Sequence, residues 1–186
     1  MSLQNIDDAA TAFVNGFAGR SPALDAVMVA VTSYGAYAIV AAVAVRWWWT
    51  GGADKLRERH LAILCGASAV LGLAINQGVL LFIHRPRPYA AHLTRLLIPP
   101  SADPSFPSDH ATLGFAVAFA LLGAGARRGS AFLLAAAVLS ISRVYVGTHY
   151  LSDVGGGALT GAVAALICLF LIKPDSWATR VFSRIL

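Results

Sequence analysis

The sequence predicts an all-α protein, a polytopic membrane helix bundle with about five transmembrane spans and interfacial helices at the N- and C-termini. Of its 186 residues, 58% are hydrophobic and only 12% are charged, which is about half the usual share of a soluble domain. The mean hydropathy is +0.69. So few charges cannot cover a soluble globule, and the chain is too hydrophobic to be disordered. We expect residues 1–186 to form a single membrane-embedded domain.

Five segments are long and almost free of charge, and each is expected to be a helix across the membrane. A span needs roughly 20 apolar residues, because a helix rises about 1.5 Å per residue. The first, second and fifth segments meet this length without a charge. The third is short and the fourth carries Arg143, so both are expected to border polar groups inside the protein. The five segments are residues 26–45, 61–83, 111–126, 129–148 and 154–172.

Both ends of the chain are expected to form helices that lie in the membrane interface. In residues 1–22 apolar residues recur at helical spacing, and the acidic pair Asp7 and Asp8 excludes a secretory signal peptide. Pro22 is expected in the first turn of the first span, where proline is tolerated. Residues 175–186 mix apolar and basic side chains and resemble a second interfacial helix.

The distribution of Lys and Arg predicts the orientation in the membrane. Nine basic residues lie in the connections 46–60 and 127–129 and in residues 173–186, and five lie on the opposite side. The positive-inside rule places the side with nine basic residues in the cytoplasm. The C-terminus is then cytoplasmic, and the N-terminus and the proline-rich loop 84–107 are external. A loop of this length in a compact protein is usually functional or disordered.

Several features of the sequence argue against the binding of nucleic acid, a metal or a cofactor. The net charge of +5 does not indicate nucleic-acid binding, because the basic residues flank apolar segments. Cys65 and Cys168 lie inside spans, where packing as small apolar residues is the default interpretation. The sequence has no CxxC pattern and no acidic cluster of the metal-ligand type, so no metal and no cofactor are expected.

Two features inside the spans predict helix packing. Gly157 and Gly161 form a GxxxG pattern in the fifth span, and this pattern lets two helix backbones approach closely. Asn76 and Gln77 lie deep in the second span. A polar amide in lipid needs a partner, so hydrogen bonds to a neighbouring helix are the default expectation there.

His149 and Asp153 lie four residues apart on the expected external side. If a helix begins near His149, both side chains lie on one face of it. A carboxylate bonded to one ring nitrogen fixes the tautomer and stabilises the imidazolium, as a histidine nucleophile or base requires. The alternative is an interfacial salt bridge that caps a helix. Arg143, near the outer end of the fourth span, either points inward to bind a phosphate or extends to the lipid headgroups.

The segment Ser108-Asp109-His110 stands at the start of the third span. Pro107 ends the loop, and Ser108 or Asp109 is expected to cap the helix. The helix N-terminus then offers free N–H groups and the positive end of a dipole, which together favour an anion. His110 in the first turn could donate a proton to a leaving oxygen. The alternative is an ordinary capped helix with a chance histidine.

A rigid external turn after the second span presents Arg85 and Arg87, each followed by proline. By itself this turn could be a basic flank for lipid phosphates. The combination with the other polar groups changes the interpretation. Chance would give the four fixed residues of Ser-Arg-x5-His-x3-Asp, which begins at Ser142, in only about 0.1% of chains of this length.

These motifs resemble those of the type-2 phosphatidic acid phosphatase family, which includes lipid phosphatases and vanadium haloperoxidases. Ser-Arg-x5-His-x3-Asp is a family motif and is matched fully from Ser142 onward. The family motif Pro-Ser-Gly-His is matched by residues 107–110, with Asp109 in place of glycine. The resemblance covers about residues 20–172.

The remaining family motif, Lys-x6-Arg-Pro, is matched by Arg87-Pro88, but Leu80 stands where the family has lysine. Arg85 and His84 are candidates to replace the missing charge. Together with the residues around the other motifs, this departure resembles the bacitracin-resistance (BcrC-type) branch, whose members are undecaprenyl-diphosphate phosphatases.

The resemblance implies a metal-independent phosphatase that removes the terminal phosphate of undecaprenyl diphosphate at the outer face of the bacterial cytoplasmic membrane. It implies a catalytic set and a phosphate-binding set, with possible accessory residues. These are His149 as nucleophile, Asp153 as its partner and His110 as acid; Arg87, Arg143 and Ser108 as phosphate ligands; and Arg85, His84 and Asp109 as accessories. Partners are then the lipid substrate and membrane lipids. The alternatives are another lipid phosphate, such as phosphatidylglycerophosphate, phosphatidate or lipid A, and a polyprenyl-phosphate binder or transporter without hydrolysis.

Overall fold

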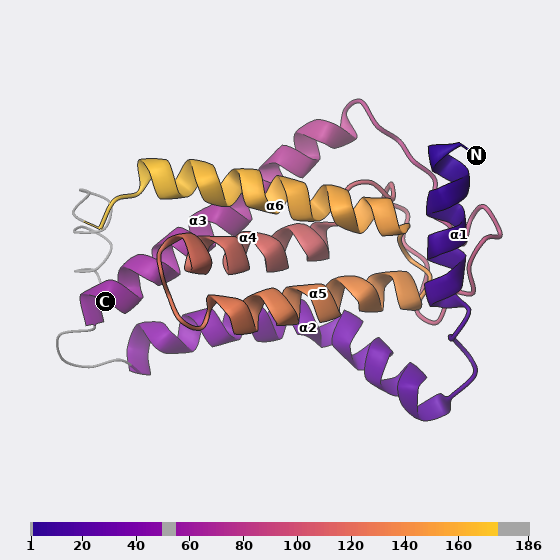
Figure 1. The fold of residues 1–186 in the computed structure, drawn as a ribbon, viewed down its shortest axis with the longest axis horizontal. Coiled ribbons are helices and arrows are strands. Elements are labelled where there is room, and N and C mark those ends of the chain that lie inside the picture. The colour runs from indigo at the N-terminus through magenta and orange to yellow at the C-terminus, as the bar shows by residue number, and fades with distance from the viewer. Residues whose placement is uncertain (1, 50–54, 175–186) are drawn as a thin grey trace.

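The computed structural model describes residues 2–49 and 55–174, which form a bundle of helices (Figure 1). No strand occurs in this part of the chain, so the prediction of an all-α membrane bundle is confirmed. The predicted C-terminal interfacial helix, residues 175–186, lies outside the described residues. The helices are α1 (Leu3–Asn15), α2 (Pro22–Trp49), α3 (Lys55–Leu80), α4 (Asp109–Gly123), α5 (Gly129–Tyr145) and α6 (Leu151–Leu171).

Among the described residues, three helices, α2, α3 and α6, are long and apolar enough to cross a membrane. The apolar helices α4 and α5 have only 15 and 17 residues. At about 1.5 Å per residue they reach about 22 and 25 Å, less than the hydrocarbon core of about 30 Å. The helix α4 begins two residues before the expected segment because Ser108 is its N-cap. The helix α5 ends at Tyr145 rather than 148, and Gly147 with a φ of 85° turns the chain there.

The short helix α4 is the centre of the bundle and packs against α3, α5 and α6. Its close approach to α6 depends on the two glycines of the GxxxG pattern. A Cβ atom at Gly157 would lie 2.5 Å from the carbonyl oxygen of Ser108, and one at Gly161 would lie 2.7 Å from that of Thr112. The predicted close packing is therefore confirmed. It fixes the first turn of α4 against α6, and both helices carry predicted site residues there.

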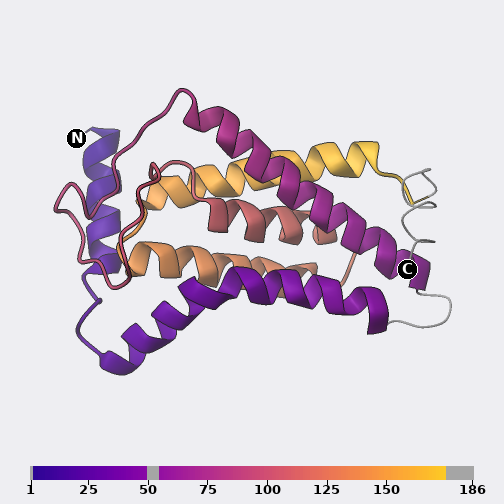
Figure 2. The same ribbon diagram turned by 180° about the vertical axis from the view of Figure 1, so that it is seen from behind.

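The segments predicted to be external gather at one end of the bundle. There α1 lies across the bundle, beside the loop 81–108 and the α5–α6 link (Figure 1). The α4–α5 turn and the end of α6 lie at the opposite end. Figure 2 shows α2 and α3 in front of α4 and α5, diverging toward the end where α1 lies.

The helix α1 turns polar residues toward the bundle and apolar residues away from it. Asn15 is buried, and its amide nitrogen donates to the carbonyl oxygens of Arg95 (2.9 Å) and Tyr145 (2.7 Å). Leu3 and Phe13 are 87% and 71% exposed. An apolar face turned away from the protein is typical of a helix that lies in a membrane interface.

Candidate active site

The imidazole of His149 is buried between the loop before α4 and the α5–α6 link. Its Nδ1 lies 2.8 Å from the carbonyl oxygen of Ser105, and its Nε2 lies 3.4 Å from Nη1 of Arg87. A carbonyl can only accept a hydrogen bond and a guanidinium can only donate one. Both neighbours therefore favour the tautomer with the proton on Nδ1 and the lone pair on Nε2.

Asp153 lies beside His149 without a direct hydrogen bond, since Nδ1 and Oδ2 are 3.6 Å apart. The helix α6 begins only at Leu151, so the two side chains do not share a helix face as the spacing had suggested. The turn before α6 brings them together instead. The fully buried carboxylate accepts hydrogen bonds from the backbone N–H of Tyr150 (2.8 Å) and from the Ser105 hydroxyl. Ser105 thus binds the imidazole through its carbonyl and the carboxylate through its hydroxyl.

The guanidinium of Arg87 is buried and fixed by backbone carbonyls. Its Nε donates to Asp103 (2.8 Å), its Nη1 to Thr148 (3.1 Å) and its Nη2 to Pro104 (3.5 Å). A guanidinium has five N–H groups, and the second N–H of Nη1 is directed at Nε2 of His149, so one N–H remains on Nη2. Arg87 is therefore positioned beside His149 with one N–H donor left for an anion.

Arg143 points into the bundle rather than toward the headgroups, and it is only 8% exposed. Its Nη1 donates to the hydroxyl of Thr32 on α2 (2.9 Å), while its buried Nε has no hydrogen-bond partner. An unpaired buried donor costs about 1–3 kcal/mol, and more when it is charged. A buried donor of this kind is suited to an acceptor oxygen of a ligand.

The N-terminus of α4 has no side-chain cap, whereas the first N–H groups of α6 have side-chain acceptors. Ser108 is the N-cap of α4, but its side chain makes no capping bond and its buried hydroxyl has no partner. In α6, the N–H of Leu151 donates to Thr11 of α1 (3.0 Å), and the N–H of Ser152 donates to Asp7 (2.9 Å). The positive end of the α4 dipole and its uncapped N–H groups are therefore suited to an anion.

His110 lies in the first turn of α4, half-buried, and interacts electrostatically with Arg143, His149 and Arg87. The three motifs, far apart in sequence, therefore meet around one point. Burial lowers the pKa of His149 below that of an ordinary histidine. Asp153 opposes this shift, and Arg143 and Arg87 add to it. The imidazole is consequently neutral at neutral pH and can act as a nucleophile.

Asp109, which stands where the resembled family has glycine, is hydrogen-bonded to α3. Its Oδ1 accepts a hydrogen bond from Nδ2 of Asn76 (2.7 Å), which also donates to the hydroxyl of Thr112 (2.9 Å). Asn76 is fully buried on α3. The predicted hydrogen bond between helices is confirmed, and it ties α3 to the first turns of α4.

Arg85 and His84, the candidates to replace the family lysine, occupy different positions. The guanidinium of Arg85 forms salt bridges of 2.7 Å with Asp153 and with Asp7 of α1. Burial opposes its charge, but the two carboxylates raise the pKa of Arg85 above its usual value. His84 is exposed and lines a cavity of about 290 Å³ together with Arg87. The charge of Arg85 is thus engaged by carboxylates.

Several residues that hold this group together carried no signal in the sequence. Ser105 lies in a proline-rich loop, and Thr32 is one hydroxyl in an apolar helix. In the sequence, Asp7 served only as evidence against a secretory signal peptide. Their partners lie 44 to 145 residues away, so only the packed structure identifies them.

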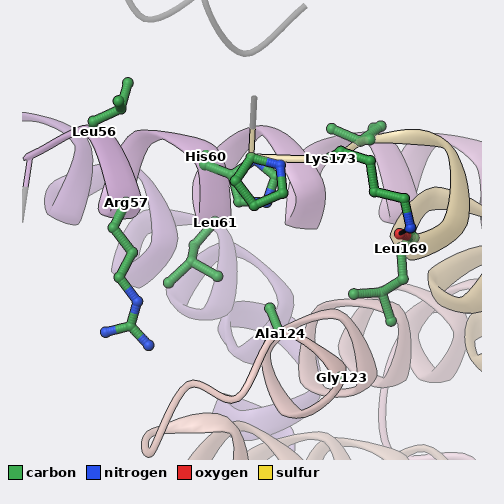
Figure 3. A pocket seen from close by; sticks show the side chains of 10 residues that line it. Leu56, Arg57, His60, Leu61, Gly123, Ala124, Leu169 and Lys173 are labelled. Carbon is green, nitrogen blue, oxygen red and sulfur yellow. Dashed lines mark hydrogen bonds between the residues drawn. The ribbon is translucent and has the colours of Figure 1, made fainter. Parts of the chain in front are cut away.

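A larger cavity, of about 570 Å³, opens at the opposite end of the bundle (Figure 3). Arg57 and His60 of α3 and Lys173 after α6 line it, together with apolar side chains. None of its residues is a predicted site residue. Cavity size therefore does not mark the candidate active site in this protein.

The fold is an α-helical membrane bundle, and two buried arginines lie near a buried, neutral histidine. Such a site is suited to a phosphate, which places the protein among membrane proteins that act on or bind phosphate groups. The chain belongs to the PAP2 superfamily, whose family model matches residues 60–177. It is 34% identical to the undecaprenyl-diphosphatase BcrC of Bacillus subtilis, over 91% of this chain and 83% of that protein. It is 28% identical to a Bacillus licheniformis protein named bacitracin transport permease protein BcrC, over 98% and 89% of the two chains.

The crystal structure of LpxE from Aquifex aeolicus has a similar fold. The TM-score is 0.70, and the match covers 87% of this chain and 93% of that chain. At 24% sequence identity this similarity concerns the fold alone.

Proposed function

We propose that the protein is an integral membrane lipid phosphatase that hydrolyses undecaprenyl diphosphate to undecaprenyl phosphate and inorganic phosphate. The observation that carries the proposal is the Nε2 lone pair of His149, which faces a buried guanidinium of Arg87 close to a second one, Arg143. Two fixed cations can hold the charged oxygens of a phosphate while a neutral imidazole reaches its phosphorus. The relative named undecaprenyl-diphosphatase supports this choice of substrate.

The terminal phosphoryl group is bound by Arg87, Arg143, Ser108 and the N–H groups at the start of α4. Phosphoryl transfer depends mainly on such positioning and charge stabilisation. Nε2 of His149 attacks phosphorus in line, and the bond from phosphorus to the bridging oxygen breaks. His110 protonates that oxygen, so undecaprenyl phosphate leaves and a phosphohistidine remains. Water then attacks the phosphorus of the phosphohistidine, His110, now deprotonated, accepts the water proton, and the P–N bond breaks to release inorganic phosphate.

The Nδ1–H of His149 stays on the Ser105 carbonyl during the attack, and the nearby carboxylate of Asp153 stabilises the positive charge that develops on the ring. The arginines supply the positive charge that a metal ion supplies in other phosphatases. We therefore expect phosphate release to continue in the presence of a chelator.

The bacterial relatives support a location in the bacterial cytoplasmic membrane, and the distribution of basic residues supports a site at the outer face. There the enzyme would act on the lipid carrier of cell-wall sugars after its use and recycle it. The polyprenyl tail would remain in the lipid or between helices, and only the headgroup would enter the site.

Phosphate release by the purified full-length protein in detergent tests the proposal. Undecaprenyl diphosphate, phosphatidylglycerophosphate, phosphatidate and lipid A are compared side by side, each with and without EDTA. Wild-type protein should release phosphate fastest from undecaprenyl diphosphate, and His149→Ala should release none while remaining monodisperse. Full activity of His149→Ala would exclude the nucleophile.

The same assay separates the alternatives. A preference for another lipid would change the substrate but keep the chemistry. The transporter interpretation, which the name of the Bacillus licheniformis relative suggests, requires lipid binding without any phosphate release. We favour hydrolysis because a transporter needs no neutral imidazole with its lone pair directed at the phosphate-binding groups.

A further inference from the structure

Arg85 is the centre of a chain of charges that runs from the N-terminal helix to the candidate active site. Its Nη1 donates to Oδ1 of Asp153 and its Nη2 to Oδ2 of Asp7, both at 2.7 Å. Nη1 also donates to the hydroxyl of Ser152 (2.7 Å). The guanidinium carbon lies 3.7 Å from the centre of the Tyr150 ring, so a cation–π contact adds to these hydrogen bonds.

The carboxylate of Asp153 needs this contact because it is completely buried. A buried charge is strongly unfavourable unless an opposite charge and hydrogen bonds compensate it. Two neutral groups, the N–H of Tyr150 and the Ser105 hydroxyl, donate hydrogen bonds to one oxygen of the carboxylate. In the described part of the chain, Arg85 is the permanent cation in contact with Asp153, since His149 is neutral before the reaction.

Asp7 holds the other side of Arg85. Its two carboxylate oxygens bind Arg85 and the first turn of α6, where Oδ1 accepts from the N–H of Ser152 (2.9 Å). Asp7 therefore joins α1, the loop after α3 and the N-terminus of α6 at one point. The neighbouring Asp8 forms no salt bridge with Arg85. It accepts a hydrogen bond from Gln4 (2.6 Å), whose Oε1 accepts one from Nη2 of Arg85 (3.4 Å), and an asparagine at position 8 keeps an acceptor oxygen for Gln4.

We propose that Arg85 is a positioning residue that keeps Asp153 ionised and in place behind His149, and that Asp7 on α1 anchors Arg85. This inference rests on the proposed function, because it assigns Asp153 the task of stabilising the His149 imidazolium. In this arrangement the terminal nitrogens of Arg85 are bound to Ser152, Asp153 and Asp7. Arg85 acts through Asp153, and α1 becomes part of the active-site architecture.

The signs of the pH effects distinguish this role from simple structural support. Removal of the Arg85 cation makes protonation of both Asp153 and His149 more favourable, so the acid limb of the activity profile moves to higher pH. Removal of the Asp7 anion makes the same surroundings more positive, so the limb moves to lower pH. Loss of packing alone would lower activity at every pH without opposite shifts. The other charged groups that face the pair are unchanged in these variants: Arg87 from the loop, Arg143 from α5 and His110 from α4.

The experiment measures kcat against pH for full-length protein in detergent with undecaprenyl diphosphate. Arg85→Gln should lower kcat at least tenfold and move the acid limb up by about half a pH unit or more. Arg85→Lys should keep the limb near its wild-type position but lower kcat, because the fork that binds two carboxylates is lost. Asp7→Asn should move the limb down, and Asp8→Asn, the matched control on the same helix, should change neither quantity.

An Arg85→Gln profile lowered equally at all pH values, or shifts of the same sign in Arg85→Gln and Asp7→Asn, would overturn the inference. If Arg85→Gln does not fold, Arg85→Lys and Asp7→Asn still decide it through the position of the limb. His149→Ala, measured beside them, separates the two proposals. An active His149→Ala contradicts the proposed function, whereas an inactive His149→Ala with a normal Arg85→Gln contradicts the positioning role alone.

Discussion

The Nδ1 atom of His149 is 2.8 Å from the carbonyl oxygen of Ser105 and 3.6 Å from the nearest carboxylate oxygen of Asp153. The backbone therefore fixes the tautomer of the imidazole, and the carboxylate contributes its charge. In a His–Asp pair joined directly, the acid has both tasks. Here the two tasks belong to two residues, and substitutions can separate them.

Asp153→Asn is expected to reduce activity without abolishing it. The Ser105 carbonyl still holds Nδ1–H, so Nε2 keeps its lone pair, but the developing imidazolium loses a negative charge. We expect a decrease in kcat on the order of 100-fold with little change in KM. Steady-state kinetics on undecaprenyl diphosphate measure both. A decrease as large as that of His149→Ala would show that the carboxylate, not the carbonyl, fixes the tautomer.

The acid limb of kcat/KM is expected below the pH at which an ordinary histidine titrates. Burial lowers the pKa of His149, with Arg143 and Arg87 adding to the shift and Asp153 opposing it. The neutral, nucleophilic ring is the form present above this pKa, so activity is lost as the pH falls through it. A pH series of initial rates at low substrate concentration measures the limb. A limb above the ordinary histidine pKa of about 6.5 would contradict this assignment.

Thr32 is expected to contribute to catalysis through Arg143 although it lies on α2, outside all three motifs. The hydroxyl accepts a hydrogen bond from Nη1 of Arg143. We expect Thr32→Val to lower kcat/KM about tenfold, since a hydrogen bond to a charged group contributes about 1.5–3 kcal/mol. Arg143→Gln should lower it at least 100-fold. Thr32→Ser keeps the hydroxyl and should remain close to wild type; an equal loss in both Thr32 variants would assign the effect to packing instead.

Gly157→Ala is expected to displace the first turn of α4 and so reduce activity. The added Cβ would lie 2.5 Å from the backbone carbonyl oxygen of Ser108, which cannot move without its helix. We expect kcat to fall at least tenfold and the Tm in detergent to fall by several degrees, because overpacking costs about 1–3 kcal/mol. Gly155→Ala is the matched control, since an added Cβ there meets no atom within 4 Å. Wild-type kinetics for Gly157→Ala would contradict the close contact.

Labelling of single cysteines is expected to show the loop 81–108 outside the cell. The background is Cys65→Ala with Cys168→Ala, both buried sites. Ala102→Cys, exposed in the loop, should react with a membrane-impermeant maleimide in intact cells. Arg57→Cys, exposed at the other end of the bundle, should react only after the membrane is opened. The reverse pattern would place the active site at the cytoplasmic face.

The sequence by itself determined the helical membrane bundle, the contrast between long and short spans, and the three motifs of the PAP2 superfamily. These properties follow from hydrophobic runs and from residues at fixed spacing, which are local features of the chain. The inward direction of Arg143, the partner of Nδ1 in His149 and the engagement of Arg85 by two carboxylates were decided only by the tertiary structure. Each depends on contacts across 44 or more residues, and the close packing of α4 on α6 and of α1 on the bundle creates them.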